Sequence, residues 1–196
     1  MTTPLAVAIL AGGASRRFGT DKAAVVIDGE PLLDRTLGIA SALTPRVAVI
    51  GGDHADLSAP VLPDREPGAG PLQAAVVAFE HFQGADLLLI PCDLPRLTVD
   101  HLRLLGAPLT ADTSKPLLAR LSENDGQPSA IPGFYSAASV ETFRAHMEAG
   151  RRALHPMLQE LPHEVLTEDD LRRHGLDPLG LRDFDTPDEL RRLSAP

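Results

Sequence analysis

The sequence predicts an α/β fold, built as a single doubly wound, mostly parallel sheet with helices on both of its faces. Three short and almost continuously apolar runs, at residues 5–10, 46–50 and 86–91, are typical of strands buried on both sides. Segments with the apolar spacing of helices lie between them, and this alternation is the pattern of parallel sheets. A chain of 196 residues is long enough for one well-buried domain, so we expect residues 1–196 to form one domain.

The first half of the chain is expected to alternate short strands with two helices. An Asp-Gly pair at 28–29 is a turn signal. Prolines at 31 and 71 favour the first turn of a helix, where the missing N–H is not needed. The predicted elements are strands at residues 5–10, 23–27, 46–50 and 61–62, and helices at residues 31–43 and 71–82.

The second half is expected to hold one more central strand, a hairpin and further helices. Thr98 is a candidate N-cap, Gly150 is placed where helices commonly end, and Thr186-Pro-Asp-Glu189 fits a capping box. The predicted elements are a strand at 86–91, a helix at 98–105, hairpin strands at 117–121 and 129–135, a helix at 136–149, helix fragments around a short strand within 151–182, and a final helix after Thr186.

Charge and cysteine content exclude several classes of function. The formal net charge is −9, whereas proteins that bind nucleic acids present a basic face to the phosphate backbone, so we expect no nucleic-acid partner. We also expect no membrane association, because no apolar run approaches the length of a membrane span and no signal-peptide pattern is present. Cys92 is the single cysteine, which excludes an internal disulfide and favours a cytoplasmic location.

The loop after the first strand combines glycine with positive charge. Residues 7–24 read VAILAGGASRRFGTDKAA. The adjacent glycines at 12–13 allow backbone amides to turn toward one anion, and Arg16, Arg17 and Lys22 supply the charge that a triphosphate needs. The two common phosphate-loop patterns, GxGxxG and Walker A, are both absent. From these residues alone, an ordinary strand-to-loop turn with solvated arginines remains the alternative.

Two aspartates are candidate metal ligands. Asp93 directly follows the strand at 86–91, at the sheet edge where ligands collect in open α/β folds. A carboxylate there suits Mg²⁺, which usually takes one or two carboxylates together with phosphate oxygens. For Asp185 two interpretations stay equally open, namely metal binding and capping of the last helix beside Thr186.

Six segments resemble the molybdenum cofactor guanylyltransferase family, which belongs to a larger group of nucleotidyltransferases. They occur in the family's order and spacing across nearly all of the chain. The LAGG form of the first motif favours the guanylyl branch over relatives that carry LAAG. The segments are LAGGASRRFGTDK from Leu10, DGEPL from Asp28, Asp64 with PGAGPL from Pro67, PCDLP from Pro91, AGRR from Ala149 and FDTPDEL from Phe184.

The resemblance implies a Rossmann-like nucleotidyltransferase fold and the transfer of GMP from GTP to the terminal phosphate of molybdenum-molybdopterin. It implies Mg²⁺ as cofactor, GTP and a molybdopterin-type acceptor as substrates, and transient contact with proteins of molybdenum cofactor biosynthesis or with molybdoenzymes. Carried over residue by residue, the family roles are nucleotide binding for Leu10, Ala11, Gly12, Gly13, Lys22, Asp64 and Asp93, catalysis for Arg17, Lys22 and Asp93, and metal binding for Asp93 and Asp185.

Three departures from the family pattern bear on the identity of the base and of the acceptor. Ile50-Gly51-Gly52 stands at the end of the strand at 46–50 where the family commonly has Asn, Gln73-Ala74 lies near the expected base site, and Asp185 replaces the usual Asn. Two alternatives follow, a related transferase that uses CTP or another phosphorylated acceptor, and a nucleotide-binding regulator without turnover. A regulator needs affinity but no charge neutralisation at a leaving group, so the joint presence of Arg17, Lys22 and Asp93 favours an enzyme.

Overall fold

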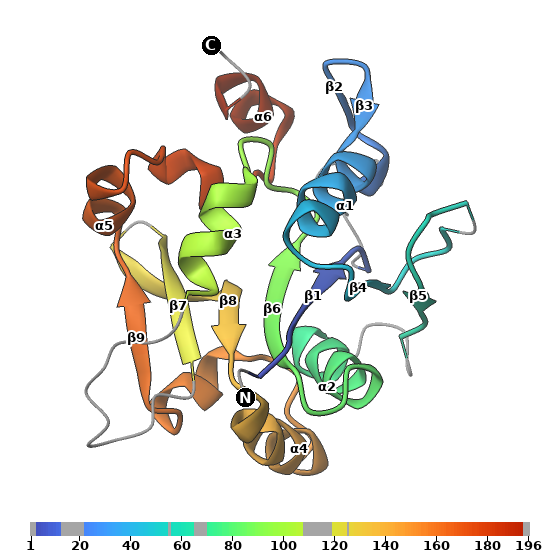
Figure 1. The fold of residues 1–196 in the computed structure, drawn as a ribbon, viewed down its shortest axis with the longest axis vertical. Coiled ribbons are helices and arrows are strands. Elements are labelled where there is room, and N and C mark those ends of the chain that lie inside the picture. The colour runs from blue at the N-terminus through green and yellow to red at the C-terminus, as the bar shows by residue number, and fades with distance from the viewer. Residues whose placement is uncertain are drawn as a thin grey trace.

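A seven-stranded sheet forms the centre of the computed structural model, which describes residues 3–12, 22–54, 56–64, 70–107, 119–124 and 126–193. Its strands are β1 (Leu5–Leu10), β4 (Val47–Ile50), β5 (Val61–Leu62), β6 (Asp86–Pro91), β7 (Ala119–Asn124), β8 (Gln127–Tyr135) and β9 (His163–Leu166). Their order is β5-β4-β1-β6-β8-β7-β9 (Figure 1). Neighbours are parallel except at β8, which runs antiparallel to β6 and β7. The predicted mostly parallel sheet is therefore confirmed.

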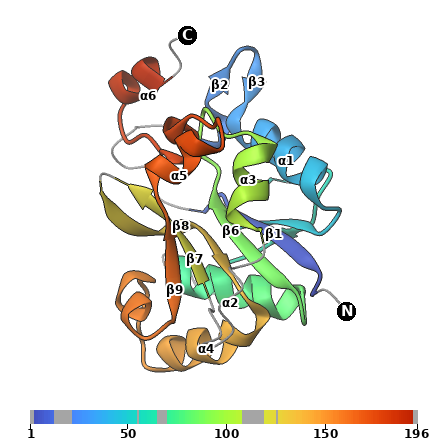
Figure 2. The ribbon, with the colours of Figure 1, turned by 60° about the vertical axis from the view of Figure 1, so that its left-hand side comes forward.

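Helices cover both faces of this sheet. They are α1 (Leu32–Leu43), α2 (Pro71–His81), α3 (Val99–Leu105), α4 (Val140–Glu148), α5 (Glu168–Arg173) and α6 (Pro187–Leu193). Helix α1 contacts α3 and helix α2 contacts α4, and the two views agree on these pairs (Figures 1 and 2). Within the described residues, no helix is long and apolar enough to cross a membrane.

The alternation of side chains along β1 explains why this strand is buried on both of its faces. Ala6 and Ala8 belong to the apolar cluster that includes residues of α2 and α4. Val7 and Ile9 point to the opposite face and belong to the cluster that includes residues of α1 and α3. All four side chains have no exposed surface. An apolar run without polar interruption is therefore what this central strand requires.

Some predicted element boundaries differ from the observed ones. The expected strand at 23–27 is a 3₁₀ turn, Lys22–Ala24, followed by β2 (Val26–Ile27), which pairs with β3 (Glu30–Pro31) around the predicted turn. Pro31 belongs to β3 and precedes α1, because its ψ of 141° is extended and not helical. The helix expected from residue 136 begins with a 3₁₀ turn, and α4 itself starts at Val140.

Backbone hydrogen bonds join the loops that leave the parallel strands. The amides of Ala11 and Gly12 both donate to the carbonyl oxygen of Ile50, at 3.0 and 3.2 Å. The amide of Cys92 donates to the oxygen of Leu10 at 3.2 Å. Strand order reverses between β1 and β6, and crevices that bind ligands form at such points beyond the carboxyl ends of the strands.

Candidate active site

Gly12, Gly51 and Asp64 lie against one another at the carboxyl edge of the sheet. A Cβ added to Gly51 would lie 2.7 Å from the Cα of Gly12 and 2.9 Å from Oδ2 of Asp64. Gly51 also has a φ of +82°, which side chains rarely allow. Because a side chain at residue 51 would meet both Gly12 and Asp64, only glycine fits this close approach.

The amides of Ala11 and Gly12 are already engaged by Ile50, as described above. Both donors are satisfied within the protein, and they fix the path of the backbone. Gly12 remains exposed, so it can line a ligand through its Cα. Gly13, Arg16 and Arg17, the other loop residues singled out from the sequence, lie outside the described residues.

The segment at residues 149–152 meets the start of α2. Gly70 has a φ of +86°, and a Cβ there would lie 2.8 Å from the carbonyl oxygen of Arg152. The same oxygen accepts a hydrogen bond from the amide of Leu72 at 3.2 Å. Two segments that are 80 residues apart and that both carry the family resemblance are therefore adjacent at this end of α2.

Lys22 joins two aspartates from distant parts of the chain. Its Nζ donates to Oδ2 of Asp93 at 2.7 Å, to Oδ1 of Asp185 at 3.1 Å and to the carbonyl oxygen of Phe184. Desolvation lowers the pKa of Lys22, but the hydrogen bonds and charges of Asp93 and Asp185 outweigh it, so the pKa lies above its ordinary value. Lys22 is therefore a positive charge held at the carboxyl edge.

Asp93 presents a buried oxygen toward this cluster. The residue is 9% exposed, and its Oδ1 has no hydrogen-bond partner among the described residues. Desolvating a carboxylate oxygen is costly unless a donor or cation satisfies it. The part of the chain that the structure describes contains no group of three or more His, Cys, Asp or Glu side chains placed to hold a metal. One or two carboxylates with phosphate oxygens are nevertheless the set that Mg²⁺ commonly takes, so the residues present fit this ion.

The structure bears on one of the two interpretations of Asp185, the capping of α6. Thr186 is the residue that caps α6, because its Oγ1 accepts from the amide of Glu189 at 3.2 Å. Oε2 of Glu189 accepts from the amides of Asp185 and Thr186, which completes the predicted capping box. The carboxylate of Asp185 faces Lys22 instead. Asp93 is likewise no cap, since Thr98 and His101 form the capping box of α3.

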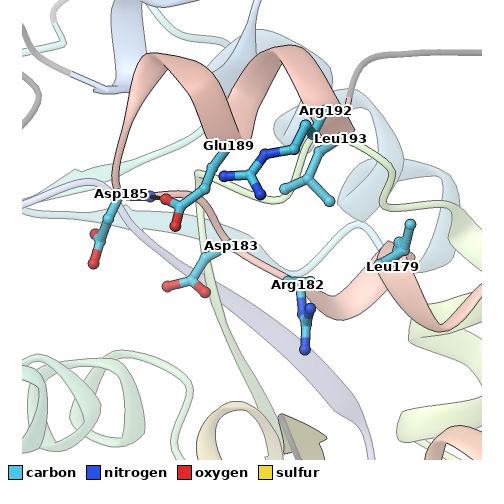
Figure 3. Close-up of a pocket in the computed structure, with 7 residues that line it drawn as sticks. All are labelled: Leu179, Arg182, Asp183, Asp185, Glu189, Arg192 and Leu193. Carbon is cyan, nitrogen blue, oxygen red and sulfur yellow. Dashed lines mark hydrogen bonds between the residues drawn. The ribbon is translucent and has the colours of Figure 1, made fainter.

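Asp183 is a member of this region that the sequence reasoning missed. It lines a pocket of about 360 Å³ between the segment 179–185 and α6 (Figure 3). Desolvation raises the pKa of Asp183, and the charge of Asp93 raises it further, although the side chain remains exposed at the pocket. Asp183 and Asp185 flank Phe184, which is 1% exposed. The sequence Asp183-Phe184-Asp185, in which two acidic residues flank an apolar one, was the available signal.

Comparison with known proteins assigns the chain to a family. Residues 7–165 match the family described as the MobA-like NTP transferase domain. The chain belongs to this family. Because the family is described as an NTP transferase domain, the protein is a nucleotidyltransferase, as the sequence resemblance predicted.

Similar proteins extend the MobA-like relationship beyond the matched domain. A probable molybdenum cofactor guanylyltransferase of Synechococcus elongatus is 36% identical over 172 residues, which cover 80% of this chain and 87% of the relative. A protein of the same name from Chloroflexus aggregans is 31% identical over 195 residues, covering 95% and 92%. The second alignment includes most of the residues beyond 165.

The fold is shared with a solved MobA-like structure. Molybdopterin-guanine dinucleotide biosynthesis protein A from Archaeoglobus fulgidus superposes with a TM-score of 0.80 over 96% of both chains. Sequence identity in that comparison is 21%, so the likeness speaks for the fold alone. The predicted Rossmann-like nucleotidyltransferase fold is confirmed.

Proposed function

We propose that the protein is a molybdenum cofactor guanylyltransferase, which transfers GMP from GTP to the terminal phosphate of molybdenum-molybdopterin and releases pyrophosphate. The observation that carries this proposal is the ion cluster of Lys22, Asp93 and Asp185 at the carboxyl edge of β6, beside the glycine loop of β1. Relatives of that name at 31–36% identity support the choice of substrates. The chain acts as one nucleotidyltransferase domain, and its buried Cys92 suits a reducing cytoplasm.

In this proposal the nucleotide binds at the carboxyl ends of β5, β4 and β1. Leu10, Ala11 and Gly12 line the base and ribose, with Gly13 continuing the same loop. Asp64, which lies against Gly12, helps to hold the guanosine. Guanine offers one acceptor and two donor groups on its pairing edge, so backbone groups near Gly70 and the amide of Gln73 can distinguish it without a charged side chain.

Mg²⁺ is the cofactor of the proposed reaction. Asp93, through the buried Oδ1 that lacks a partner among the described residues, and Asp185 would hold the ion. When bound, the ion supplies charge neutralisation at the phosphates of GTP. The ion pairs of both carboxylates with Lys22 support a site for positive charge at this place in the fold.

The chain's own residues position the substrates and stabilise charge. The attacking phosphate of the acceptor is an anion at neutral pH, so the reaction needs no strong general base and no covalent intermediate. Lys22 stays protonated because its pKa is raised, and it stabilises negative charge on the triphosphate together with Arg17. Catalysis then rests on in-line positioning and electrostatic stabilisation, as in other phosphoryl and nucleotidyl transfers.

An omission series tests the proposal. Pyrophosphate release is measured with GTP, molybdenum-molybdopterin and Mg²⁺ together, and then with each component left out. The proposal expects release only in the complete mixture, at a rate that follows the acceptor concentration. Release that is independent of the acceptor indicates simple hydrolysis and contradicts the assignment.

A further inference from the structure

The carboxylate of Asp185 reaches the charged cluster from a segment near the C-terminus. This segment begins at Asp177, passes through a 3₁₀ turn, Pro178–Leu181, and leads to Asp185 ahead of α6 (Figure 3). The side chain of Asp185 is 58% exposed, so burial does not fix its position. Phe184 is buried in a cluster with Leu32 of α1, which ties the segment to one side of the site. The tie to the loop that follows β6 is made by other residues.

His101 in the first turn of α3 makes this second tie. The residue is 2% exposed, and its Nε2 lies 2.9 Å from the carbonyl oxygen of Asp177. Its Nδ1 lies 3.2 Å from the backbone nitrogen of Thr98. Because a backbone N–H only donates and a carbonyl oxygen only accepts, Nδ1 is the acceptor and Nε2 carries the proton. The Nε2–H tautomer therefore satisfies α3 and the C-terminal segment at the same time.

Two further contacts hold the same segment against the loop and helix that follow β6. The guanidinium group of Arg96 lies 2.8 Å from Oδ2 of Asp177, and it also donates to the carbonyl oxygen of Leu193 at 3.2 Å. A Cβ added to Gly180 would overlap the imidazole of His101, so glycine allows the 3₁₀ turn to lie directly on the ring. The segment is therefore gripped at its start and, beyond Asp185, at the end of α6.

These contacts bear on the spacing of the two carboxylates that we place at Mg²⁺. Asp93, Arg96 and His101 belong to one stretch of chain, and Asp185 belongs to the segment that this stretch holds. Mg²⁺ requires near-ideal octahedral geometry, with ligand distances of roughly 2.0–2.1 Å. A displacement of about 1 Å at a reacting centre can lower a rate about 100-fold. The spacing of Asp93 and Asp185 is therefore sensitive to the anchor at Asp177.

We propose that His101 is a positioning residue of the nucleotidyl transfer, which holds residues 177–185 against α3 and so sets the place of Asp185 relative to Asp93. This inference rests on the proposed function and adds a residue to it. His101 contacts neither substrate nor metal and acts through the backbone of Asp177. Its two ring nitrogens have separate tasks, because Nδ1 serves the cap of α3 and Nε2 serves the metal-binding carboxylates.

Two substitutions of His101 separate these tasks. The side-chain oxygen of Asn can take the place of Nδ1, so His101→Asn keeps the acceptor for Thr98 and loses the donor to Asp177. The amide nitrogen of Gln can take the place of Nε2, so His101→Gln keeps that donor and loses the acceptor. We expect His101→Asn to raise the Mg²⁺ concentration for half-maximal pyrophosphate release about tenfold, as loss of an outer-shell partner commonly does. His101→Gln is expected to restore a value within about twofold of the wild type, since the donor to Asp177 is retained.

The controls account for folding and for the cap of α3. Thr98→Ala removes the hydroxyl group that lies 2.7 Å from Nδ1 of His101 and leaves the contact with Asp177, so its Mg²⁺ dependence is expected to match the wild type. Gly180→Ala pushes the 3₁₀ turn away from an intact His101 and is expected to behave like His101→Asn. Circular dichroism and urea midpoints check that each variant is folded.

A second readout needs neither substrates nor metal. The chain has two lysines, Lys22 and Lys115, so protein labelled with ¹³C,¹⁵N-lysine gives few side-chain signals, and Lys115→Met assigns them. The signal of Lys22 reports its contacts with Asp93 and Asp185. We expect this signal to move in His101→Asn and to keep its wild-type position in His101→Gln, with Lys115 as the internal reference.

The outcomes distinguish the inference from the proposed function. An unchanged Mg²⁺ dependence and an unchanged Lys22 signal in His101→Asn overturn the inference and leave the proposed function standing. Equal losses in His101→Asn and His101→Gln assign His101 to the cap of α3 alone and also overturn it. Absence of turnover in the wild-type protein with GTP, Mg²⁺ and molybdenum-molybdopterin refutes the proposed function itself.

Discussion

The charged residues of the site are individually visible in the sequence, but their contacts are not. Lys22 and Asp93 are 71 residues apart, and Lys22 and Asp185 are 163 apart. The residue types and their places after strands predicted ligands for phosphate and metal. Their pairing depends on the register of the whole sheet and on the burial of Phe184, which local patterns do not specify.

Replacing Asp93 with Asn tests its assigned role at the metal. The amide has nearly the same shape, so the fold is expected to persist, but one charge and one anionic oxygen are lost. We expect turnover at saturating Mg²⁺ to fall by about 10²–10³-fold, the range seen when one electrostatic contact of a transition state is removed. Steady-state pyrophosphate release measures this, with circular dichroism as the check on folding. Turnover close to that of the wild type contradicts the assignment.

The raised pKa of Lys22 predicts how the contribution of this residue to the free energy of unfolding depends on pH. A lysine whose pKa is higher in the folded state stabilises the protein below its unfolded pKa, near 10.5, and loses that contribution as the pH rises through the folded value. The difference in unfolding free energy between the wild type and Lys22→Met is expected to be constant at neutral pH and to shrink above about pH 10.5.

Urea titrations from neutral to alkaline pH measure this difference. The chain has two lysines, Lys22 and Lys115, so Lys115→Met is the matched control. The single tyrosine, Tyr135, is common to all variants, and burial raises its pKa, which moves its titration further from this window. A difference for Lys22→Met that stays constant throughout the alkaline range indicates that Lys22 is not held by Asp93 and Asp185.

The elements that carry the site were predicted with accurate positions where the signals are local. The central strands follow from uninterrupted apolar runs, the N-cap of α3 from Thr98, and the capping box of α6 from Thr186 and Glu189, three positions apart. The hairpin of β7 and β8 was predicted, but the pairing of β8 with β6 and the close approach of Gly12 to Gly51 were not, because each depends on which strands become neighbours.

Gly51→Ala tests the contact between the loops that follow β1 and β4. The substitution places a Cβ 2.7 Å from the Cα of Gly12 and forces a residue with a side chain into positive φ. The positive φ alone is expected to lower the free energy of unfolding by about 1–2 kcal/mol. We expect a larger loss of stability than this, together with weaker GTP binding, because the two loops must separate.

Gly84→Ala is the control for this variant. Gly84 has a φ of +72°, and no heavy atom lies within 4 Å of a Cβ built there. Gly84→Ala therefore measures the free-energy cost of a positive φ without any close contact of the new Cβ. Urea midpoints and calorimetric titration with GTP give the comparison. Equal effects of the two substitutions mean that the close approach of Gly51 to Gly12 does not affect the free energy of unfolding or GTP binding.

Thr186→Ala tests how α6 positions the aspartates before it. The cap is expected to contribute about 1 kcal/mol, as N-caps commonly do. Because Asp185 leads directly into this capping box, turnover is expected to fall as well. Thr167 makes the same capping box at the start of α5, and Thr167→Ala is the matched control. The two variants should lose similar stability, and only Thr186→Ala should lose turnover; equal turnover in both contradicts a positioning role for the α6 cap.

At the scale of the whole molecule, the carboxyl edge of one sheet brings together segments from distant parts of the chain. Gly12 follows β1, Gly51 follows β4, and Asp93 of the charged cluster follows β6. The sequence resemblance predicted the fold and the family, and both are confirmed. The adjacency of these segments became visible only with the strand order.

The most direct test of this account identifies the product. The protein is incubated with Mg²⁺, molybdenum-molybdopterin and equal concentrations of GTP, CTP, ATP and UTP, and the dinucleotide formed is identified by mass spectrometry. A site built to pair with a purine's polar edge rejects a pyrimidine because its buried polar groups are left unpaired. The account predicts the guanine dinucleotide as the predominant product. Predominance of the cytosine dinucleotide, or the absence of any dinucleotide, would contradict it.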